Sequence, residues 1–342
     1  MYPSISYNDK NFDKKLINRI KRDGLVVVTD IFQDDQCDKY VSDIVESFEQ
    51  LGTNIDRNNL EKTWTQYNLP PQTRAGLFQT LVSNFPTVWK IRSNNKIKKI
   101  YQTLYTNFRG ENQNDFMVSG DAINVKPGTV GPYDSERDWA HIDQTCYDDT
   151  YQCVQGQAVL TNTSACFVAS PKSHLLYNGI RSKFNLDENK TNWFRIPEDK
   201  INYVEKKLAS IGGQYQIPIL APKGSCIFWL STTIHSARLQ TEREEPTANM
   251  WDGWRCVVYV CYRPKSEFTS RQINSRIDAY NNNRTTNHWG KLFPKKPGNY
   301  HLYNIQRHPT IMSAIDNPIE VYDRIGKPEL SDRQLALIGL IN

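Results

Sequence analysis

The chain has 342 residues, 38% of them apolar and 23% charged, a composition able to bury a large core. Its 42 basic and 37 acidic residues leave a net charge of only +5. The basic residues form no stripe of the kind that binds long nucleic acid, so that partner is not expected. No apolar run approaches the roughly 18 residues of a membrane span, and the N-terminus lacks the apolar region of a signal peptide. Seven cysteines without a CxxC pair fit a reducing compartment, so we expect a soluble, cytoplasmic protein with no membrane contact.

Residues 1–114 form a mainly helical region that we expect to pack on the rest of the chain. Apolar residues recur at helical spacing in four segments, which are 11–24, 34–52, 73–85 and 95–108. Gly24 and Gly52 follow the first two segments, where a helix commonly stops. The run "LVVVTDIF" (25–32) between them indicates a short buried strand.

The period changes from helical to strand-like over 115–265, which we expect to be the β core of the chain. Short strands alternate with Pro/Gly turns at 115–133, 152–173, 213–237 and 254–264, a spacing typical of a β sandwich or barrel. A helical insert at 185–215 interrupts them, with a helix over 195–213 that starts near Pro197.

Residues 266–342 form a polar C-terminal extension. Ser331 and Gln334 have the spacing of a capping box ahead of a last helix. The extension has enough aromatic residues and prolines to wrap the core or to support a homodimer contact, and the sequence does not decide between them. The fold class expected from this organisation is mainly β with helical additions (α+β).

One segment of the core, "DWAHIDQTCYDD" (138–149), carries the first candidate chemistry. In a strand, His141 and Asp143 point to the same face, so both side chains can reach one point. The simplest interpretation is a hydrogen-bonded His–Asp pair. However, "GSCIFWLSTTIHSA" ends an apolar strand on His235, and two imidazoles with one carboxylate are the ligand set that holds non-haem Fe(II) with positions left open.

Arg255 opens the next strand, "RCVVYVCY". An arginine on the inner face of a barrel needs an anion, because an unpaired buried charge is costly. The anion is either a carboxylate of the chain itself, in a structural salt bridge, or a carboxylate of a ligand held in two-point contact.

The order of these parts resembles the phytanoyl-CoA dioxygenase-like branch of the Fe(II)/2-oxoglutarate-dependent oxygenases. The resemblance runs from about 22 to 264 and rests on three segments: "RDGLVVVTDIFQDDQC", "VQGQAVLTNTSACFVASPKSHL" and "GSCIFWLSTTIHSA". It implies a double-stranded β-helix, a jelly-roll, cupin-like barrel, with N-terminal helices. It also implies that His141, Asp143 and His235 are the catalytic metal ligands.

The same resemblance assigns Arg255 to the distal carboxylate of 2-oxoglutarate, with Asn124 and Gln157 in the cosubstrate pocket. The loop before Arg255 is longer than is common in the family, which leaves Arg238 as the alternative. His174 follows a turn in which Lys172 stands where the family usually has glycine, and we interpret this histidine as structural.

The implied activity is a dioxygenase that uses Fe(II), 2-oxoglutarate and O2, releases succinate and CO2, and hydroxylates a C–H bond of an unidentified small molecule or protein side chain. Two alternatives remain: a cupin-like metal protein that does not turn over 2-oxoglutarate, and an inactive binding module. Cupin-like sites usually carry three or more histidines, whereas the other histidines, His288, His301 and His308, lie in the polar tail. The loop aromatics Trp193 and Phe194 either pack or contact substrate, as do Met250, Trp251 and Trp254 in the 241–254 loop.

Overall fold

The computed structural model describes the following residues: 2–74, 76–128, 139–147, 149–186, 191–238, 249–289 and 307–341. The chain folds as two compact units. Unit 1 comprises residues 1–32, 103–111 and 127–255, and unit 2 comprises 33–102, 112–126 and 256–342. The three-part division of the sequence at 114 and 265 concerns segments rather than compact units, and it stays a prediction.

Unit 1 contains most of the strands. One group pairs in the order β1 (Ser4–Ser6), β2 (Leu25–Thr29), β12 (Cys226–Leu230) and β8 (Val154–Val159). A five-stranded antiparallel sheet has the order β10 (Phe194–Arg195), β7 (His141–Ile142), β13 (His235–Ala237), β9 (Phe167–Ala169) and β11 (Ile217–Ile219). The helical elements are α1 (Phe12–Asp23), η2 (Ser173–Leu176), α6 (Tyr177–Lys183) and α7 (Glu198–Ser210).

The two groups of strands in unit 1 face each other. Trp229 of β12 and Phe167 of β9 meet with ring centroids 4.6 Å apart, and both rings are buried. Because paired residues of neighbouring strands point to the same face, Gln155 of β8, in register with Trp229, also points between the sheets. The inner faces therefore enclose both apolar rings and polar side chains.

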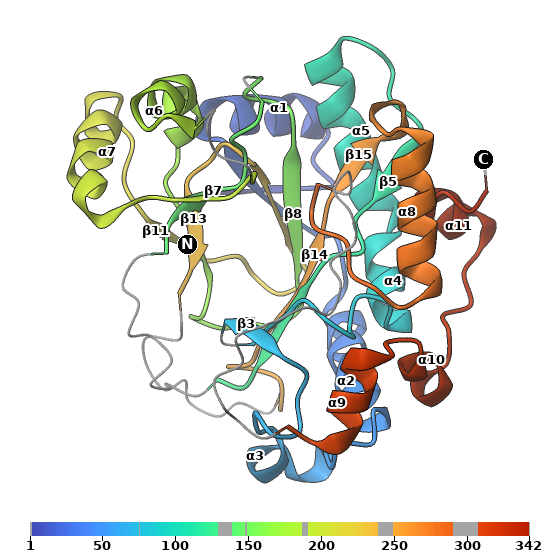
Figure 1. Cartoon of the computed structure of the whole chain (residues 1–342). Coiled ribbons are helices and arrows are strands. Elements are labelled where there is room, and N and C mark those ends of the chain that lie inside the picture. The colour runs from blue at the N-terminus through green and yellow to red at the C-terminus, as the bar shows by residue number, and fades with distance from the viewer. Residues whose placement is uncertain are drawn as a thin grey trace. The chain divides into compact units, whose positions relative to one another are not determined.

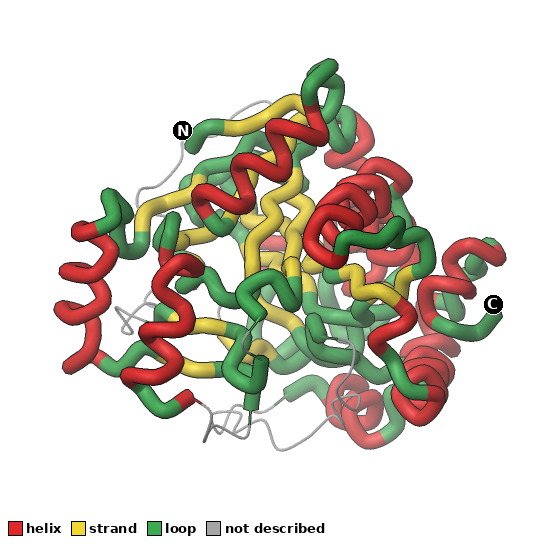
Figure 2. The backbone as a smooth tube through the Cα atoms, turned by 90° about the horizontal axis from the view of Figure 1, so that it is seen from above, coloured by secondary structure: helices red, strands yellow, loops and turns green. Residues whose placement is uncertain are grey.

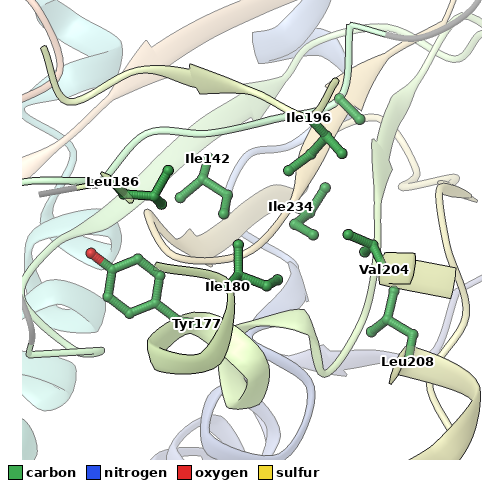
Figure 3. Close-up of a cluster of buried hydrophobic side chains, with 9 residues drawn as sticks. Ile142, Tyr177, Ile180, Leu186, Ile196, Val204, Leu208 and Ile234 are labelled. Atoms are coloured by element: carbon green, nitrogen blue, oxygen red, sulfur yellow. The ribbon is translucent and has the colours of Figure 1, made fainter. Parts of the chain in front are cut away.

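The other face of the five-stranded sheet is covered by helices α6 and α7 (Figures 1 and 2). Ile142 of β7 and Ile234, just before β13, enter a buried apolar cluster with residues of these helices (Figure 3). The remaining members of the cluster are Ala140, Tyr177, Ile180, Leu186, Ile196, Val204 and Leu208. This packing fixes which side chains of β7 and β13 face the other way.

Helix α1 ends and β2 begins at Gly24, which packs tightly. Its φ is +76°, a region that favours glycine. A Cβ there would lie 2.5 Å from both His174 Nδ1 and Thr233 Oγ1. The Gly24 carbonyl accepts a hydrogen bond from Thr233 Oγ1 at 2.9 Å, so this turn supports the residues that precede His235.

Gly24→Ala is expected to lower the free energy of unfolding by about 3 kcal/mol, since left-handed strain and overpacking add. Gly110→Ala is the matched control, because its φ is +71° and a Cβ there would meet no atom within 4 Å. The control should lose only the conformational contribution, about 1 kcal/mol. Urea unfolding of the two variants measures the difference. An equal loss of unfolding free energy in the two variants would show that contact of the added Cβ with His174 and Thr233 is not destabilising.

Unit 2 is mostly helical. Its helical elements are α2 (Asp34–Gln50), η1 (Arg57–Asn59), α3 (Leu60–Thr63), α4 (Pro86–Arg92), η4 (Lys265–Glu267), α8 (Ser270–Asn281), α9 (Pro309–Asp316), α10 (Glu320–Ile325) and α11 (Asp332–Ile338). Its strands pair as β6 (Ile123–Lys126), β4 (Leu77–Phe78) and β3 (Gln72–Arg74), and as β5 (Phe116–Val118) with β15 (Tyr262–Pro264). Helix α5 (Asn95–Arg109) and strand β14 (Arg255–Val260) contribute residues to both units.

Most predicted elements are confirmed, and the fold is α+β with large sheets. Helices lie at four of the predicted places as α1, α2, α5 and α7, and the Ser331–Gln334 capping box opens α11. The predicted helix over 73–85 is wrong, because the chain forms the β3–β4 hairpin and α4 starts only at Pro86. Gly76 turns the hairpin with a φ of +74°, and its N–H donates to Gln72 Oε1 at 2.7 Å. In the described part of the chain, no helix is long and apolar enough to cross a membrane.

Candidate metal centre

His141, Asp143 and His235 come together in unit 1. His141 lies on β7 and His235 on β13, two neighbouring strands (Figure 1). The two residues are in direct register in this antiparallel pair. One donor atom from each of the three side chains lies within 4.8 Å of the others. Each residue is at most 6% exposed.

Strand alternation and one backbone bond aim these side chains at a common point. Ile142 and Ile234 point into the apolar cluster, so their neighbours point to the opposite face. Asp143 is fixed next to them, because its N–H donates to the Ser231 carbonyl at 3.0 Å.

The two imidazoles present the same nitrogen to the carboxylate. His141 Nδ1 lies 3.0 Å from the Trp139 carbonyl, and His235 Nδ1 lies 2.9 Å from the Thr233 carbonyl. A carbonyl only accepts, so each Nδ1 carries the hydrogen and each Nε2 has a free lone pair. These Nε2 atoms lie 3.6 Å (His141) and 3.3 Å (His235) from Asp143 Oδ2.

Burial and hydrogen bonds at the site favour cation binding. Burial lowers the pKa of His235 below its usual value, and the nearby His141 lowers it further, so His235 stays neutral. Gln155 Nε2 donates to Asp143 Oδ2 at 2.9 Å and to Ser231 Oγ at 3.2 Å, which orients the carboxylate. Two imidazoles and one carboxylate, with no fourth ligand among the described residues, fit a divalent metal with open positions.

Arg255 has the features of an anion site. It is 3% exposed, and its Nη1 donates to the Ala165 carbonyl at 2.9 Å. Its Nε and Nη2 are buried and have no hydrogen-bond partner in the described part of the chain. No carboxylate among the described residues pairs with this guanidinium. Two free N–H groups of a buried guanidinium fit a carboxylate.

Arg255 and His235 both contact the segment 165–167. The Ala165 carbonyl that holds Arg255 lies two residues before Phe167, whose ring centroid is 5.5 Å from that of His235. Cys166, between them, has a pKa raised by burial, while the nearby Arg238 and Arg255 lower it. Arg238 is therefore close as well, but it is only half-buried, and its Nε donates to the Ser164 carbonyl at 3.2 Å.

The other two predicted cosubstrate residues differ in placement. Gln157 is buried on β8, two residues from Gln155 and on the same inward face. Its Oε1 has no hydrogen-bond partner in the described residues. Asn124 is buried on β6 of unit 2, in register with Leu77 of β4. Its part in the cosubstrate pocket stays a prediction.

Two residues at the site were not predicted from the sequence. Gln155 holds Asp143, and Trp229 lies with its ring centroid 5.4 Å from that of His235. The buried Trp229 Nε1 has no partner in the described residues. The sequence "VQGQAV" could have indicated Gln155. Its two glutamines alternate with apolar residues and therefore share one face of the strand.

His174 is a structural residue. It is buried, and its Nε2 lies 2.9 Å from the Lys21 carbonyl at the end of α1. Lys172, which replaces the usual glycine of the preceding turn, adopts a φ of +71°. This value explains why glycine is the common residue there.

The free energy of unfolding should therefore fall in mild acid, because His174 is buried in its neutral form. Burial lowers its pKa below the ordinary 6.5, against smaller opposing effects of the Lys21 carbonyl and Asp23. As the pH falls, the unfolded chain takes up this proton first, so stability is lost below about pH 6.5 by at most about 1.4 kcal/mol per pH unit. Urea unfolding between about pH 7 and about pH 5 should show a shallower decline for His174→Gln than for the wild type. Parallel declines would contradict this role.

A sequence model of the phytanoyl-CoA dioxygenase family matches residues 20–242, well over half of the chain and including all three metal-site residues. The chain belongs to this family. Its cofactors are accordingly iron and 2-oxoglutarate, and the triad is able to hold a metal ion. Its function is of the oxygenase type.

Individual relatives are distant. Ava biosynthesis cluster protein O of Aspergillus versicolor is 20% identical over 270 residues, which cover 75% of this chain and 79% of that protein. The crystal structure of a putative oxidoreductase from Salmonella typhimurium LT2 has a TM-score of 0.57 at 11% identity and covers 99% of this chain and 86% of that one. This likeness concerns the fold. The epimerase SnoN, in complex with Fe3+, alpha ketoglutarate and nogalamycin RO, has a TM-score of 0.49 at 15% identity, covering 74% and 84% of the two chains.

The loop residues that were expected either to pack or to contact substrate separate into buried and exposed ones. Phe194 packs against the apolar cluster of unit 1, whereas Trp193 is exposed. In the 241–254 loop Met250 is exposed and Trp251 is buried, with Trp254 in edge contact with it. Residues 241–248 lie outside the described residues, as does His301, while His308 caps α9.

Proposed function

We propose that the protein is an Fe(II)- and 2-oxoglutarate-dependent dioxygenase that hydroxylates a C–H bond of its substrate. The observation that carries this proposal is a metal-competent triad together with a buried arginine, two of whose nitrogens have no hydrogen-bond partner among the described residues. Both lie in unit 1, linked through the 165–167 segment.

Each residue has a defined role in this proposal. His141 and His235 offer their Nε2 lone pairs, and Asp143 offers a carboxylate oxygen that Gln155 holds in place. Arg255 receives the distal carboxylate of 2-oxoglutarate in two-point contact. The open coordination positions are left for the 2-oxo acid end and for O2.

Iron and 2-oxoglutarate supply the oxidising chemistry when bound: O2 converts 2-oxoglutarate into succinate and CO2, and its second oxygen atom enters the substrate C–H bond. The protein orients the reactants and keeps water out. Phe167 and Trp229, in contact with His235 and with each other, close the inner side of the site with apolar surface. No side chain needs to act as a general base.

We also propose that the facing sheets of unit 1 belong to a double-stranded β-helix, the jelly-roll barrel of this enzyme class. Support comes from the antiparallel order of the five-stranded sheet and from the Trp229–Phe167 contact between the sheets. The placement of metal ligands on β7 and β13 agrees with a site built at the mouth of such a barrel.

Anaerobic titration with Fe(II) and 2-oxoglutarate, followed by a succinate assay in air, tests the activity on the wild type and on His141→Ala. The wild type should bind both and release succinate slowly without substrate, while His141→Ala should do neither. His308→Ala, which changes a helix cap of unit 2, should behave as the wild type. Metal binding that 2-oxoglutarate does not affect would favour a cupin-like protein, and no binding at all would favour an inactive binding module.

A further inference from the structure

The face of the sheet that carries the metal ligands continues onto the edge strand β10. Arg195 of β10 is in register with His141 of β7, so the two side chains point to the same face. Phe194 is in register with Ile142 and packs with it in the apolar cluster. Trp193, one residue earlier, therefore returns to the face of the metal ligands.

Contacts and exposure confirm the position of Trp193. Its ring centroid lies 5.8 Å from that of His141, at an interplanar angle of 37°. The indole is nevertheless 45% exposed, and it is the only exposed tryptophan of the eight, all of which lie in the described part of the chain. A large aromatic ring that is 45% exposed beside a candidate metal ligand can contact a bound molecule through its exposed part.

The segment that carries this indole is held in place. Asn192 Oδ1 accepts hydrogen bonds from the backbone N–H groups of Thr145 at 3.2 Å and Cys146 at 3.1 Å. Thr145 Oγ1 also donates to the Thr191 carbonyl. Thr145 follows the metal ligand Asp143 by two residues, so the indole is fixed relative to the metal site. A ring that is already positioned loses little conformational entropy when it binds a partner.

Arg195 adds a positive charge to the same face. It is exposed, and it lies two residues from Trp193 along an edge strand, about 7 Å by strand geometry. An indole face and a guanidinium at this spacing suit a flat ring and an anionic substituent on the same molecule.

We propose that Trp193 and Arg195, the β10 patch, form the substrate subsite, and that the substrate is a planar ring compound bearing an anionic group. This inference rests on the proposed function, because it places the substrate beside the proposed iron. The ring lies against Trp193 and the anion pairs with Arg195, which leaves the C–H bond to be oxidised near His141.

Binding of simple probes tests the subsite without turnover. Naphthalene-2-sulfonate has the ring and the charge, naphthalene-2-sulfonamide lacks the charge, and cyclohexanesulfonate lacks the flat ring. Calorimetric titrations of protein loaded with Mn(II) and 2-oxoglutarate keep the triad and Arg255 occupied. The wild type should bind the first probe about tenfold more tightly than either of the others, in line with one stacking or one charged contact.

The variants assign this preference to residues. Trp193→Ala should lose about tenfold in affinity for naphthalene-2-sulfonate, and Trp193→Phe should recover part of it. Arg195→Ala should abolish the preference for sulfonate over sulfonamide. Leu175→Ala, which removes another exposed apolar side chain of unit 1 (56% exposed), should bind as the wild type. Equal affinity for the three probes, no binding, or unchanged binding by Trp193→Ala would overturn the inference.

The two proposals can fail separately. The affinity for 2-oxoglutarate is measured in the same samples before each probe is added. Loss of 2-oxoglutarate binding with the probe preference intact would refute the oxygenase function and leave the β10 patch as a ring-binding site. Normal 2-oxoglutarate binding without probe preference would refute the patch alone.

Discussion

Asp143→Ala is expected to weaken metal binding by at least about a hundredfold, because removal of a residue that merely orients a ligand already costs 10–100-fold in other metal sites. Asp143 is the only carboxylate of the triad, so its loss leaves two imidazoles to hold a divalent cation. Succinate formation should fall with the metal occupancy. Calorimetric titration with Mn(II) or Fe(II) under anaerobic conditions measures the change.

Asp149→Ala is the matched control for this variant. Asp149 is a half-exposed carboxylate six residues along the chain, paired with Arg109 at 2.9 Å and outside the triad. Metal affinity should be unchanged in this variant. If Asp143→Ala and Asp149→Ala bound metal equally well, the convergence of the three side chains would be structural rather than metal-binding.

Arg255→Ala is expected to weaken 2-oxoglutarate binding by about 100-fold, since a charge-assisted contact with a buried group contributes about 3 kcal/mol. 2-Oxobutyrate makes the test specific, because it has the 2-oxo acid end but lacks the distal carboxylate. The wild type should strongly prefer 2-oxoglutarate to 2-oxobutyrate, and Arg255→Ala should bind the two equally. Arg255→Lys should be intermediate, because a lysine keeps the charge and loses the fork.

Arg238→Ala distinguishes the two arginines near Cys166. It removes a half-buried guanidinium that bonds to the Ser164 carbonyl, so it should leave the preference for 2-oxoglutarate largely intact. A larger loss in Arg238→Ala than in Arg255→Ala would move the cosubstrate contact to Arg238.

The sequence was sufficient to place His141 and Asp143 on one face, because alternation in a strand is a strong local rule. His141 and Asp143 flank Ile142, and the isoleucine has to face the core, so the two polar side chains share the other face. That rule does not predict that His235 lies close to His141 and Asp143. It depends on the pairing of β13 with β7 over a long stretch of chain, and the order of motifs in the family resemblance supplied it.

Other features depend on contacts that a sequence pattern does not contain. The segment 73–85 has helical periodicity, but its backbone pairs in the β3–β4 hairpin and with β6, so tertiary pairing overrides the local preference. Trp193 and Phe194 are equivalent as loop aromatics in the sequence. Register with β7 sends one into the core and leaves the other beside His141. Similarly, Gln155 could not be assigned to Asp143 before the sheet order was known.

The central claim is that one site holds a metal through the triad and 2-oxoglutarate through Arg255 at the same time. The measurement that tests it most directly is the affinity for 2-oxoglutarate by calorimetry, without metal and with saturating Mn(II). Because a bound 2-oxo acid would share the metal, the account predicts that Mn(II) tightens 2-oxoglutarate binding by at least about tenfold, the size of a typical coupling between linked ligands. An affinity that is the same with and without metal would contradict it.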